Sequence, residues 1–319
     1  MAQQTLDTRK VLGHTLSILA EKDERILGMT ADMSFIIPEF KNKFPERFID
    51  VGIAEQNMVS IASGLAVSGM IPFVTTMAAF MTMRPCEQIR TDVCYNNANV
   101  KIAGTGGGTA YGNQGNTHMA LEDLAILNTF PNIVILIPAD GVEAEEAVKA
   151  AVKHQGPVYI RLGRGEDPVI YETGYSFGGS KLEFNIGKIV TLKDGSDVTI
   201  VAAGCSIVNQ ALEAAKLLES KGFSATVLNV HTLKPFDRET LLKAARKTGA
   251  IVTVEDHQIT NGLGATVCQT VAAEGCARVK CLGVPDTFVP MMDQMGLYHH
   301  YSMDAEGIFN AAQELIKKK

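Results

Sequence analysis

Short runs of apolar residues alternate along the chain with longer segments whose apolar residues recur at helical spacing. The runs predict strands, and the longer segments predict helices. In the first half, the predicted strands cover residues 26–30, 48–51, 71–76, 100–103, 133–137 and 158–162. The predicted helices cover residues 5–21, 55–69, 79–95, 120–128 and 142–154. Strands and helices that alternate in this way predict a mostly parallel, doubly wound sheet.

A second α/β pattern begins after a looser, glycine-rich stretch. Its predicted strands cover residues 198–202, 225–230, 250–255 and 279–284. Its predicted helices cover residues 207–221, 238–248, 264–274 and 305–318. We therefore predict a doubly wound domain over residues 1–180, a linker over 181–196 and a smaller C-terminal α/β domain over 197–319.

Composition narrows the function classes. The net charge of -6 and the lack of a basic run before the terminal lysines argue against nucleic-acid binding. No apolar stretch approaches a membrane span, and the polar N-terminus does not resemble a secretory signal. The six cysteines show no metal-ligand spacing. We expect reduced thiols, no membrane contact, no metal site in this chain and a cytoplasmic location.

The segment 50–57 carries the strongest candidate for chemistry. A strand there runs through Gly52 and brings Glu55 to the first turn of a helix. Asp32 lies at the end of the preceding predicted strand. Because ligands bind beyond the carboxyl ends of strands in such sheets, we expect both carboxyls at a ligand crevice. The structural alternative for Glu55 is that it only stabilises the helix dipole.

A glycine-rich loop at residues 104–112 follows another predicted strand and leads to His118. So many glycines suit either a flexible lid or a backbone that passes close to a ligand. Arg9 and Arg164 are placed to bind an anion at the same edge, with Arg161 as a competing candidate. For each arginine, the structural alternative is a surface ion pair.

Several of these segments resemble known proteins in order and spacing. The first-half motifs are Thr8-Arg9-Lys10, Thr30-Ala31-Asp32, Gly52-Ile53-Ala54-Glu55, Thr75-Thr76-Met77 with Phe80, Thr117-His118 and Gly163-Arg164. They resemble the pyrimidine-binding domain of transketolase. The second-half motifs are Val-Thr-Ile-Val-Ala-Ala-Gly at 198–204, His-Thr-Leu-Lys-Pro at 231–235 and Gly-Val-Pro-Asp at 283–286. They are similar to the C-terminal domain of that family.

The resemblance implies an enzyme that uses thiamin diphosphate to transfer a two-carbon ketol unit. In its terms, Glu55 contacts N1′ of the aminopyrimidine, which favours the tautomer whose N4′ removes the C2 proton of the thiazolium. Asp32, Ile53, Met77 and Phe80 match positions that surround the pyrimidine. Phe80 keeps an aromatic wall there.

The resemblance also implies substrate contacts. His118 matches the histidine that positions and protonates the sugar. Arg9 and Arg164 match the arginines that hold the terminal phosphate of the substrate. Gln114 stands where the family has an aspartate that recognises a hydroxyl beside the acceptor aldehyde.

Three departures from the family pattern bear on the substrate. Gly106 replaces a histidine, Asn113-Gln114 replaces Glu-Asp, and Ile36 replaces a serine that contacts phosphate. These changes imply an altered sugar geometry and an altered anion site. We therefore expect a ketose phosphate or an unusual ketose as donor and an aldose phosphate as acceptor, and a branched ketose or one ending in a sulfonate fits these changes better than xylulose 5-phosphate.

One family motif is missing from this sequence. Thiamin enzymes bind Mg²⁺ and diphosphate through Gly-Asp-Gly followed further along by Asn-Asn. Here Asn96-Asn97 has no Gly-Asp-Gly before it, and Asp140-Gly141 has no Asn after it. We expect a separate N-terminal transketolase subunit to supply these ligands, with active sites at the interface of a two-plus-two heterotetramer.

Two other functions remain open from the sequence. A β subunit of a 2-oxo acid dehydrogenase E1 component shares the architecture and the glutamate, although Thr117-His118 and Arg9 favour transketolase. A non-catalytic regulatory subunit is the second alternative, and the retained Glu55 and His118 argue against it.

Overall fold

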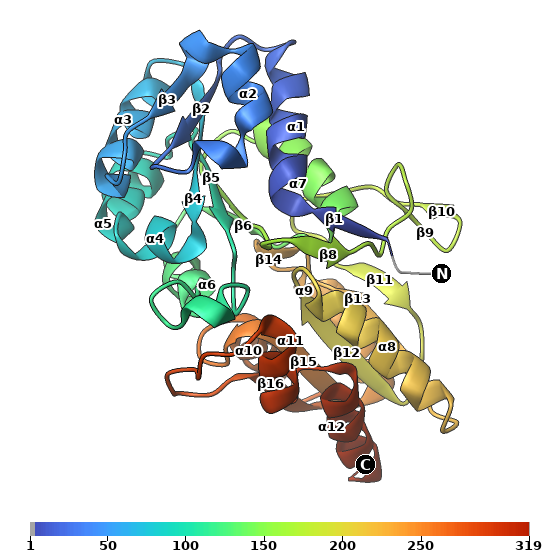
Figure 1. Cartoon of the computed structure of the whole chain (residues 1–319). Helices are drawn as coiled ribbons and strands as arrows, with labels where there is room; N and C mark the ends of the chain where they lie inside the picture. The colour runs from blue at the N-terminus through green and yellow to red at the C-terminus, as the bar shows by residue number, and fades with distance from the viewer. Residues whose placement is uncertain (1–3, 319) are drawn as a thin grey trace.

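The computed structural model describes residues 4–318. These residues fold around two large sheets, which lie one above the other in Figure 1. The larger sheet has seven strands in the order β14-β6-β7-β5-β4-β2-β3. Their bounds are Ile26–Thr30 (β2), Phe48–Asp50 (β3), Ile71–Met77 (β4), Lys101–Thr105 (β5), Val134–Leu136 (β6), Val158–Arg161 (β7) and Thr232–Lys234 (β14). All pairs are parallel except β14 with β6, so the predicted doubly wound sheet is confirmed.

Helices cover both faces of this sheet because neighbouring strand residues point to opposite sides. On one face, α1 (Thr8–Ala20) packs against α7 (Gly141–Lys153), over a core that includes Phe73 of β4. On the other face, α3 (Glu55–Val67) buries Met58 and Ala62 against a core that includes Val74.

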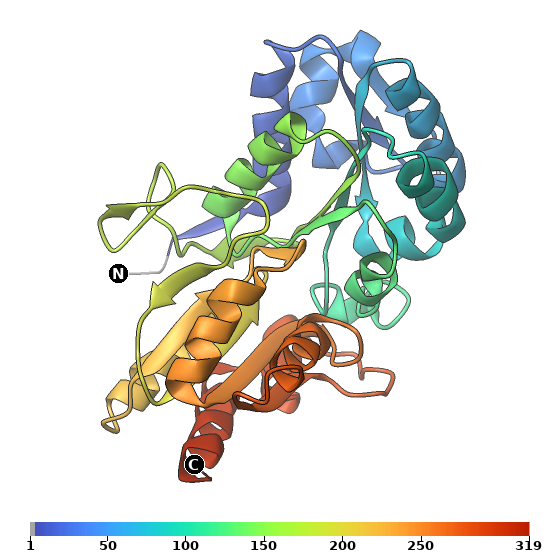
Figure 2. The ribbon, with the colours of Figure 1, turned by 180° about the vertical axis from the view of Figure 1, so that it is seen from behind.

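The smaller sheet has five strands in the order β11-β13-β12-β15-β16. Their bounds are Val190–Lys193 (β11), Val198–Ala203 (β12), Ala225–Asn229 (β13), Ala250–Gln258 (β15) and Arg278–Val284 (β16). The helices α8 (Ile207–Glu219) and α12 (Ala305–Lys317) cover one face, while α9 (Arg238–Thr248) and α10 (Leu263–Ala272) cover the other. Figures 1 and 2 show α8 and α9 on opposite sides of this sheet.

The predicted helix over residues 5–21 is wrong at its start. Thr5–Asp7 forms strand β1, which pairs with β8 (Glu166–Pro168). The helix begins only at Thr8, because the Asp7 carboxylate accepts a hydrogen bond from the backbone N–H of Arg9.

The predicted helix over residues 79–95 is interrupted at Pro85. The segment divides into α4 (Ala78–Met83), α5 (Cys86–Gln88) and a π-helical stretch at Ile89–Tyr95. Proline has no N–H to donate and its ring clashes within a helix, so a continuous helix cannot form there.

Several elements come from stretches without a clear pattern. The predicted linker contains β11, which pairs with β13, and the short hairpin of β9 (Ser176–Phe177) and β10 (Ser180–Lys181) precedes it. The short helices α2 (Pro38–Lys43) and α11 (Gln294–His300) were not predicted either, whereas α6 (Asp123–Asn128) lies within the helix predicted over residues 120–128. Among residues 4–318, no helix has the length and apolar character needed to cross a bilayer.

The two halves are joined in two ways. Strand β14 comes from the second half yet extends the larger sheet, and one apolar cluster continues from Ile137 to Leu233 and Val201 across the junction. The proposed limits of the two domains therefore remain a prediction, since the chain crosses between the sheets more than once.

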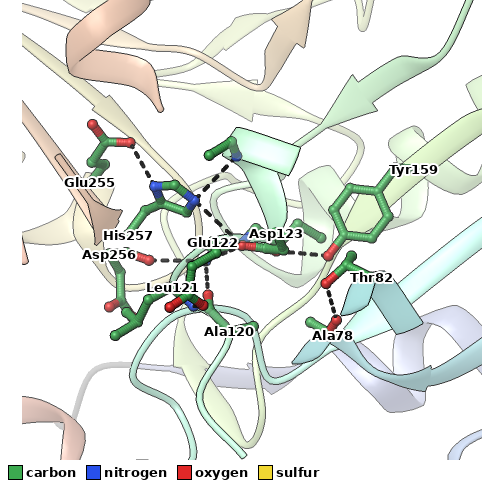
Figure 3. A network of polar contacts seen from close by, with 12 residues as sticks. Ala78, Thr82, Ala120, Leu121, Glu122, Asp123, Tyr159, Glu255, Asp256 and His257 are labelled. Atoms are coloured by element: carbon green, nitrogen blue, oxygen red, sulfur yellow. Dashed lines mark hydrogen bonds and ion pairs between the residues drawn. The ribbon is translucent and has the colours of Figure 1, made fainter. Parts of the chain in front are cut away.

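A buried ion pair lies at this junction. Arg161 ends β7 and donates two hydrogen bonds to Asp123, from Nε to Oδ2 at 2.8 Å and from Nη2 to Oδ1 at 3.1 Å. The Tyr159 hydroxyl donates to the same carboxylate at 2.7 Å (Figure 3). Burial raises the pKa of Asp123, but Arg161, His257 and the Tyr159 hydroxyl together outweigh it and the net shift is downward.

Replacing Arg161 with methionine leaves the Asp123 carboxylate buried without its cation. We expect this change to lower the free energy of unfolding by about 3–5 kcal/mol, measured by urea denaturation. The matched control is Arg246→Met, which breaks a pair with Glu274 that is 58% and 43% exposed. That change is expected to cost about 0–1 kcal/mol. Equal losses for the two variants would contradict a structural role of the buried pair.

Candidate active site

The strand ends of the larger sheet bring the predicted site residues to one edge. Asp32 follows β2, Glu55 follows β3, Met77 ends β4 and Arg164 follows β7. These strands are parallel members of one sheet, so their carboxyl ends meet at the same side of it.

Glu55 is the first residue of α3 and only 2% of it is exposed. The turn before it uses Gly52 at a φ of 69°, a conformation that favours glycine. The Asp50 carboxylate accepts hydrogen bonds from the backbone N–H groups of Asp32 and Gly52, both at 3.0 Å. These two bonds tie the ends of β2 and β3 together and fix where Glu55 enters its helix.

Glu55 borders a cavity of about 150 Å³. The lining residues are Ala31, Asp32, Met33, Ile53, Glu55, Thr76, Met77, Phe80 and Arg84. All the residues predicted to bind the pyrimidine are among them. Asp32 is exposed and Ile53 is 74% exposed, so these two lie where the cavity meets the surface. The cavity is therefore largely apolar around one buried carboxyl.

Arg84 is a member of this cavity that the sequence analysis missed. Its Nη1 donates to Glu55 Oε1 at 2.5 Å, and its guanidinium lies 3.9 Å from the centre of the Phe80 ring. Arg84 thus contacts both the carboxyl and the aromatic face. Its position one helical turn after Phe80 was the only sequence signal for this contact.

His118 continues the row of contacts beyond Phe80. The two rings lie 5.4 Å apart in an edge-on arrangement, and the Tyr111 ring lies 6.2 Å from that of His118. The Nδ1 atom of His118 hydrogen-bonds the Thr117 hydroxyl at 2.8 Å, which leaves Nε2 available to a ligand.

Tyr111 is the second residue that the sequence analysis missed, and it organises the cationic end of the site. The Arg164 guanidinium lies 4.2 Å from the centre of its ring. The main partner of Arg9 is the Asp7 carboxylate, which accepts a hydrogen bond from its Nη2 at 2.8 Å and raises the pKa of the guanidinium. The nearby Tyr111 phenol adds to this rise. Arg161 is excluded as the anion-binding arginine, because it is buried against Asp123.

The structure gives physical reasons for two departures from the family pattern. A Cβ atom on Gly106 would lie 2.0 Å from Cε2 of Tyr111, so the tyrosine ring fills the space beside this glycine. Ile36 is buried in the core under α1 and does not line the cavity. Gln114 ends a short 3₁₀ turn at Gly112–Gln114 and is exposed at the loop surface.

The assembled row runs from Glu55 through Phe80 and His118 to Tyr111 and its arginines. It offers a carboxyl, an aromatic face, a histidine and two guanidinium groups, which suit an uncharged ring at one end and an anion at the other. Within residues 4–318, no group of three or more His, Cys, Asp or Glu side chains could hold a metal ion.

Comparison with known proteins gives the family of each half. Residues 4–168 match the family model of the transketolase pyrimidine-binding domain, and residues 187–308 match that of the transketolase C-terminal domain. The first of these models covers more than half of the chain.

Whole-length relatives agree with the family models. One subunit of the apulose-4-phosphate transketolase of Phocaeicola vulgatus is 41% identical over 100% of both chains. The 6-deoxy-6-sulfo-D-fructose transketolase subunit of a Clostridium species is 37% identical over 94% of this chain and 91% of its own length. A solved structure described as a split gene transketolase, inactive beta4 tetramer, is 39% identical, with a TM-score of 0.89 over 98% of this chain and 99% of its own. The chain therefore belongs to the transketolase family and corresponds over its whole length to the C-terminal subunit of a split transketolase.

Proposed function

We propose that this chain supplies the pyrimidine-binding half of the active site in a two-chain, thiamin diphosphate-dependent transketolase. The observation that carries the proposal is the buried Glu55 carboxyl in an apolar cavity beside Phe80. Family membership implies thiamin diphosphate. The residues present fit the aminopyrimidine ring, which needs an aromatic or apolar wall and one carboxyl partner.

In this proposal, Glu55 binds N1′ of the pyrimidine, and Ile53, Met77 and Phe80 form its walls, with Asp32 at the mouth. When bound, the cofactor supplies the carbon nucleophile for ketol transfer. Arg84 contacts both Glu55 and the Phe80 ring in the chain alone. Arg84 thus engages one oxygen of Glu55 and one face of the Phe80 ring.

His118 and Gln114 act on the sugar. In ketol transfer, the C2–C3 bond of the donor ketose breaks and the two-carbon unit bonds to the aldehyde carbon of the acceptor. The C3 hydroxyl of the donor loses a proton, and the carbonyl oxygen of the acceptor gains one. His118 exchanges these protons through Nε2, because Nδ1 is engaged with Thr117. Gln114 provides an amide where an aspartate would accept from a sugar hydroxyl.

The anionic end of the substrate binds to Arg9 and Arg164 around Tyr111. Because Tyr111 occupies the space beside Gly106, this subsite differs from one built around a histidine. We propose a donor other than xylulose 5-phosphate, a branched ketose phosphate or a sulfonated ketose, with an aldose phosphate as acceptor. The names of two relatives support this choice, since one is named for a 4-phosphate and the other for a 6-sulfo sugar.

An N-terminal transketolase subunit provides the Mg²⁺ and diphosphate ligands in this proposal. Large apolar side chains in and near the cavity segments remain exposed, including Phe35 at 63%, Ile53 at 74% and Met83 at 44%. Such side chains suit a partner surface. We propose a two-plus-two heterotetramer, and the description of the solved relative as an inactive tetramer of β chains fits a need for the partner.

A cytoplasmic location is also proposed. It is supported by the cysteines, all of which are free thiols in the structure.

Glu55→Ala tests the central assignment. Assayed with the partner subunit, this variant is expected to lose at least about two orders of magnitude in ketol-transfer rate. The matched control is Glu306→Ala, which removes an exposed acid from the first turn of α12. That control is expected to keep the activity, because it affects only a helix terminus. An unchanged rate in Glu55→Ala would favour a regulatory subunit.

Gln114→Asp tests the substrate proposal. The wild-type complex is expected to use a branched or sulfonated ketose with a higher kcat/KM than xylulose 5-phosphate. Restoring the aspartate should raise kcat/KM for xylulose 5-phosphate relative to that for the unusual ketose by about tenfold or more, because a carboxylate accepts a hydrogen bond from the sugar hydroxyl. The control is Asn113→Asp, which adds the same charge one residue earlier. Xylulose 5-phosphate as the best wild-type donor would contradict the proposal.

A further inference from the structure

The loop that carries Gln114 and His118 is held in place by the C-terminal half of the chain. We call residues 105–118 the substrate loop. Its main anchor is Thr109, whose backbone N–H donates to both carboxylate oxygens of Asp256 at 3.0 Å. The Thr109 hydroxyl donates to Asp256 Oδ2 at 3.1 Å. Asp256 lies near the end of β15, so the loop and its anchor come from different sheets.

Asp256 is itself fixed by groups outside the loop. The Tyr298 hydroxyl donates to its Oδ2 at 3.0 Å, and Gln294 Nε2 donates to the same atom at 3.2 Å. Its backbone oxygen accepts from Arg161 Nη2 at 3.0 Å. Only 4% of Asp256 is exposed. The carboxylate is therefore held by α11 as well as by its own strand.

Two glycines allow the close approach between the loop and this anchor. A Cβ atom on Gly108 would lie 2.2 Å from Cγ of Asp256, and one on Gly112 would lie 2.3 Å from the backbone oxygen of Met292. Close packing thus explains part of the glycine content that the sequence alone left open between a lid and a close approach.

The loop is also closed at its base and held near its end. Gly108 and Ala120 exchange backbone hydrogen bonds at 2.9 and 3.0 Å. Asn116 exchanges two bonds with the backbone of Val289, at 2.8 and 2.9 Å. Gln114 and His118 lie between these fixed points, so their positions depend on contacts with the C-terminal half.

We propose that Asp256 is a positioning residue for the substrate: it orders the substrate loop so that His118 and Gln114 are in place before the sugar and the partner subunit bind. This inference rests on the proposed roles of His118 and Gln114. A glycine-rich loop has much conformational entropy to lose on ordering, and a prior anchor removes that loss from substrate binding. The C-terminal half thereby sets sugar affinity without lining the cofactor cavity.

The test compares Asp256→Asn with wild type in the full two-chain complex. The asparagine keeps the shape but turns one acceptor into a donor, which faces the backbone N–H of Thr109 at either oxygen position. We expect KM for the donor sugar to rise roughly 10- to 100-fold, because the loop no longer holds its geometry. The Kd of thiamin diphosphate, measured by calorimetry with Mg²⁺, should remain within about twofold, since Glu55 and Phe80 are unaffected. Hydrogen exchange should become faster within residues 105–118.

The matched control is Thr199→Val on β12 of the same sheet. Thr199 is equally buried, and its hydroxyl contacts Thr248 and the backbone oxygen of Ala244 instead of the loop or Asp256. This variant is expected to lose stability while KM and loop exchange stay unchanged. If Asp256→Asn does not fold, Thr109→Val serves in its place by removing one loop-side bond, and Thr109→Ser should restore the wild-type KM.

Two results would overturn the inference: an unchanged KM and unchanged loop exchange in the folded Asp256 or Thr109→Val variant, or a loss of cofactor affinity equal to the rise in KM. The first result would leave Asp256 as a stabilising contact only. Failure of the proposed function is a separate outcome, because a wild-type complex without ketol transfer still reports loop protection by hydrogen exchange.

Discussion

The guanidinium group of Arg161 joins three parts of the molecule that are distant in sequence. It pairs with Asp123 at the start of α6, and its Nη2 also donates to the backbone oxygens of Ala120 and Asp256. Because Asp123 is fully buried, the pair cannot loosen without leaving a charge in the interior. The end of β7, the exit of the substrate loop and the end of β15 are therefore held in one arrangement. The exit of the substrate loop, two residues after His118, is thereby fixed relative to both sheets.

Much of the fold could be predicted from local patterns. Apolar runs identified the central strands of both sheets, and the carboxyl-edge rule placed Asp32, Glu55 and Arg164 together. Predictions failed where a single residue overrode the pattern, as Pro85 does in the segment after Phe80 and Asp7 does at the start of α1. Strands β11 and β14 were not predicted, because short edge strands depend on partners far away in the sequence.

The candidate site likewise contains residues that the sequence identified and residues that it did not. Motif spacing identified the residues around the cavity and at the loop exit, whereas the roles of Arg84, Tyr111 and Asp256 depend on their contacts with Glu55, Arg164 and Thr109, which are distant in sequence. Tyr111 stands alone among glycines, and nothing local shows that its ring fills the space beside Gly106. Gly108 is likewise required because a Cβ there would clash with Asp256, which belongs to a strand of the other sheet. Side chains of this kind leave no periodic signal in the sequence.

The central claim is that this chain holds one half of a cofactor site. In the proposed assignment, this chain binds the pyrimidine and the sugar, while another subunit supplies the ligands of the diphosphate and Mg²⁺. The most direct measurement is calorimetry of thiamin diphosphate with Mg²⁺, first on this chain alone and then on its mixture with the N-terminal subunit. The account predicts tight binding only in the mixture. Tight binding by this chain alone would contradict it and would mean that the diphosphate site lies within this chain.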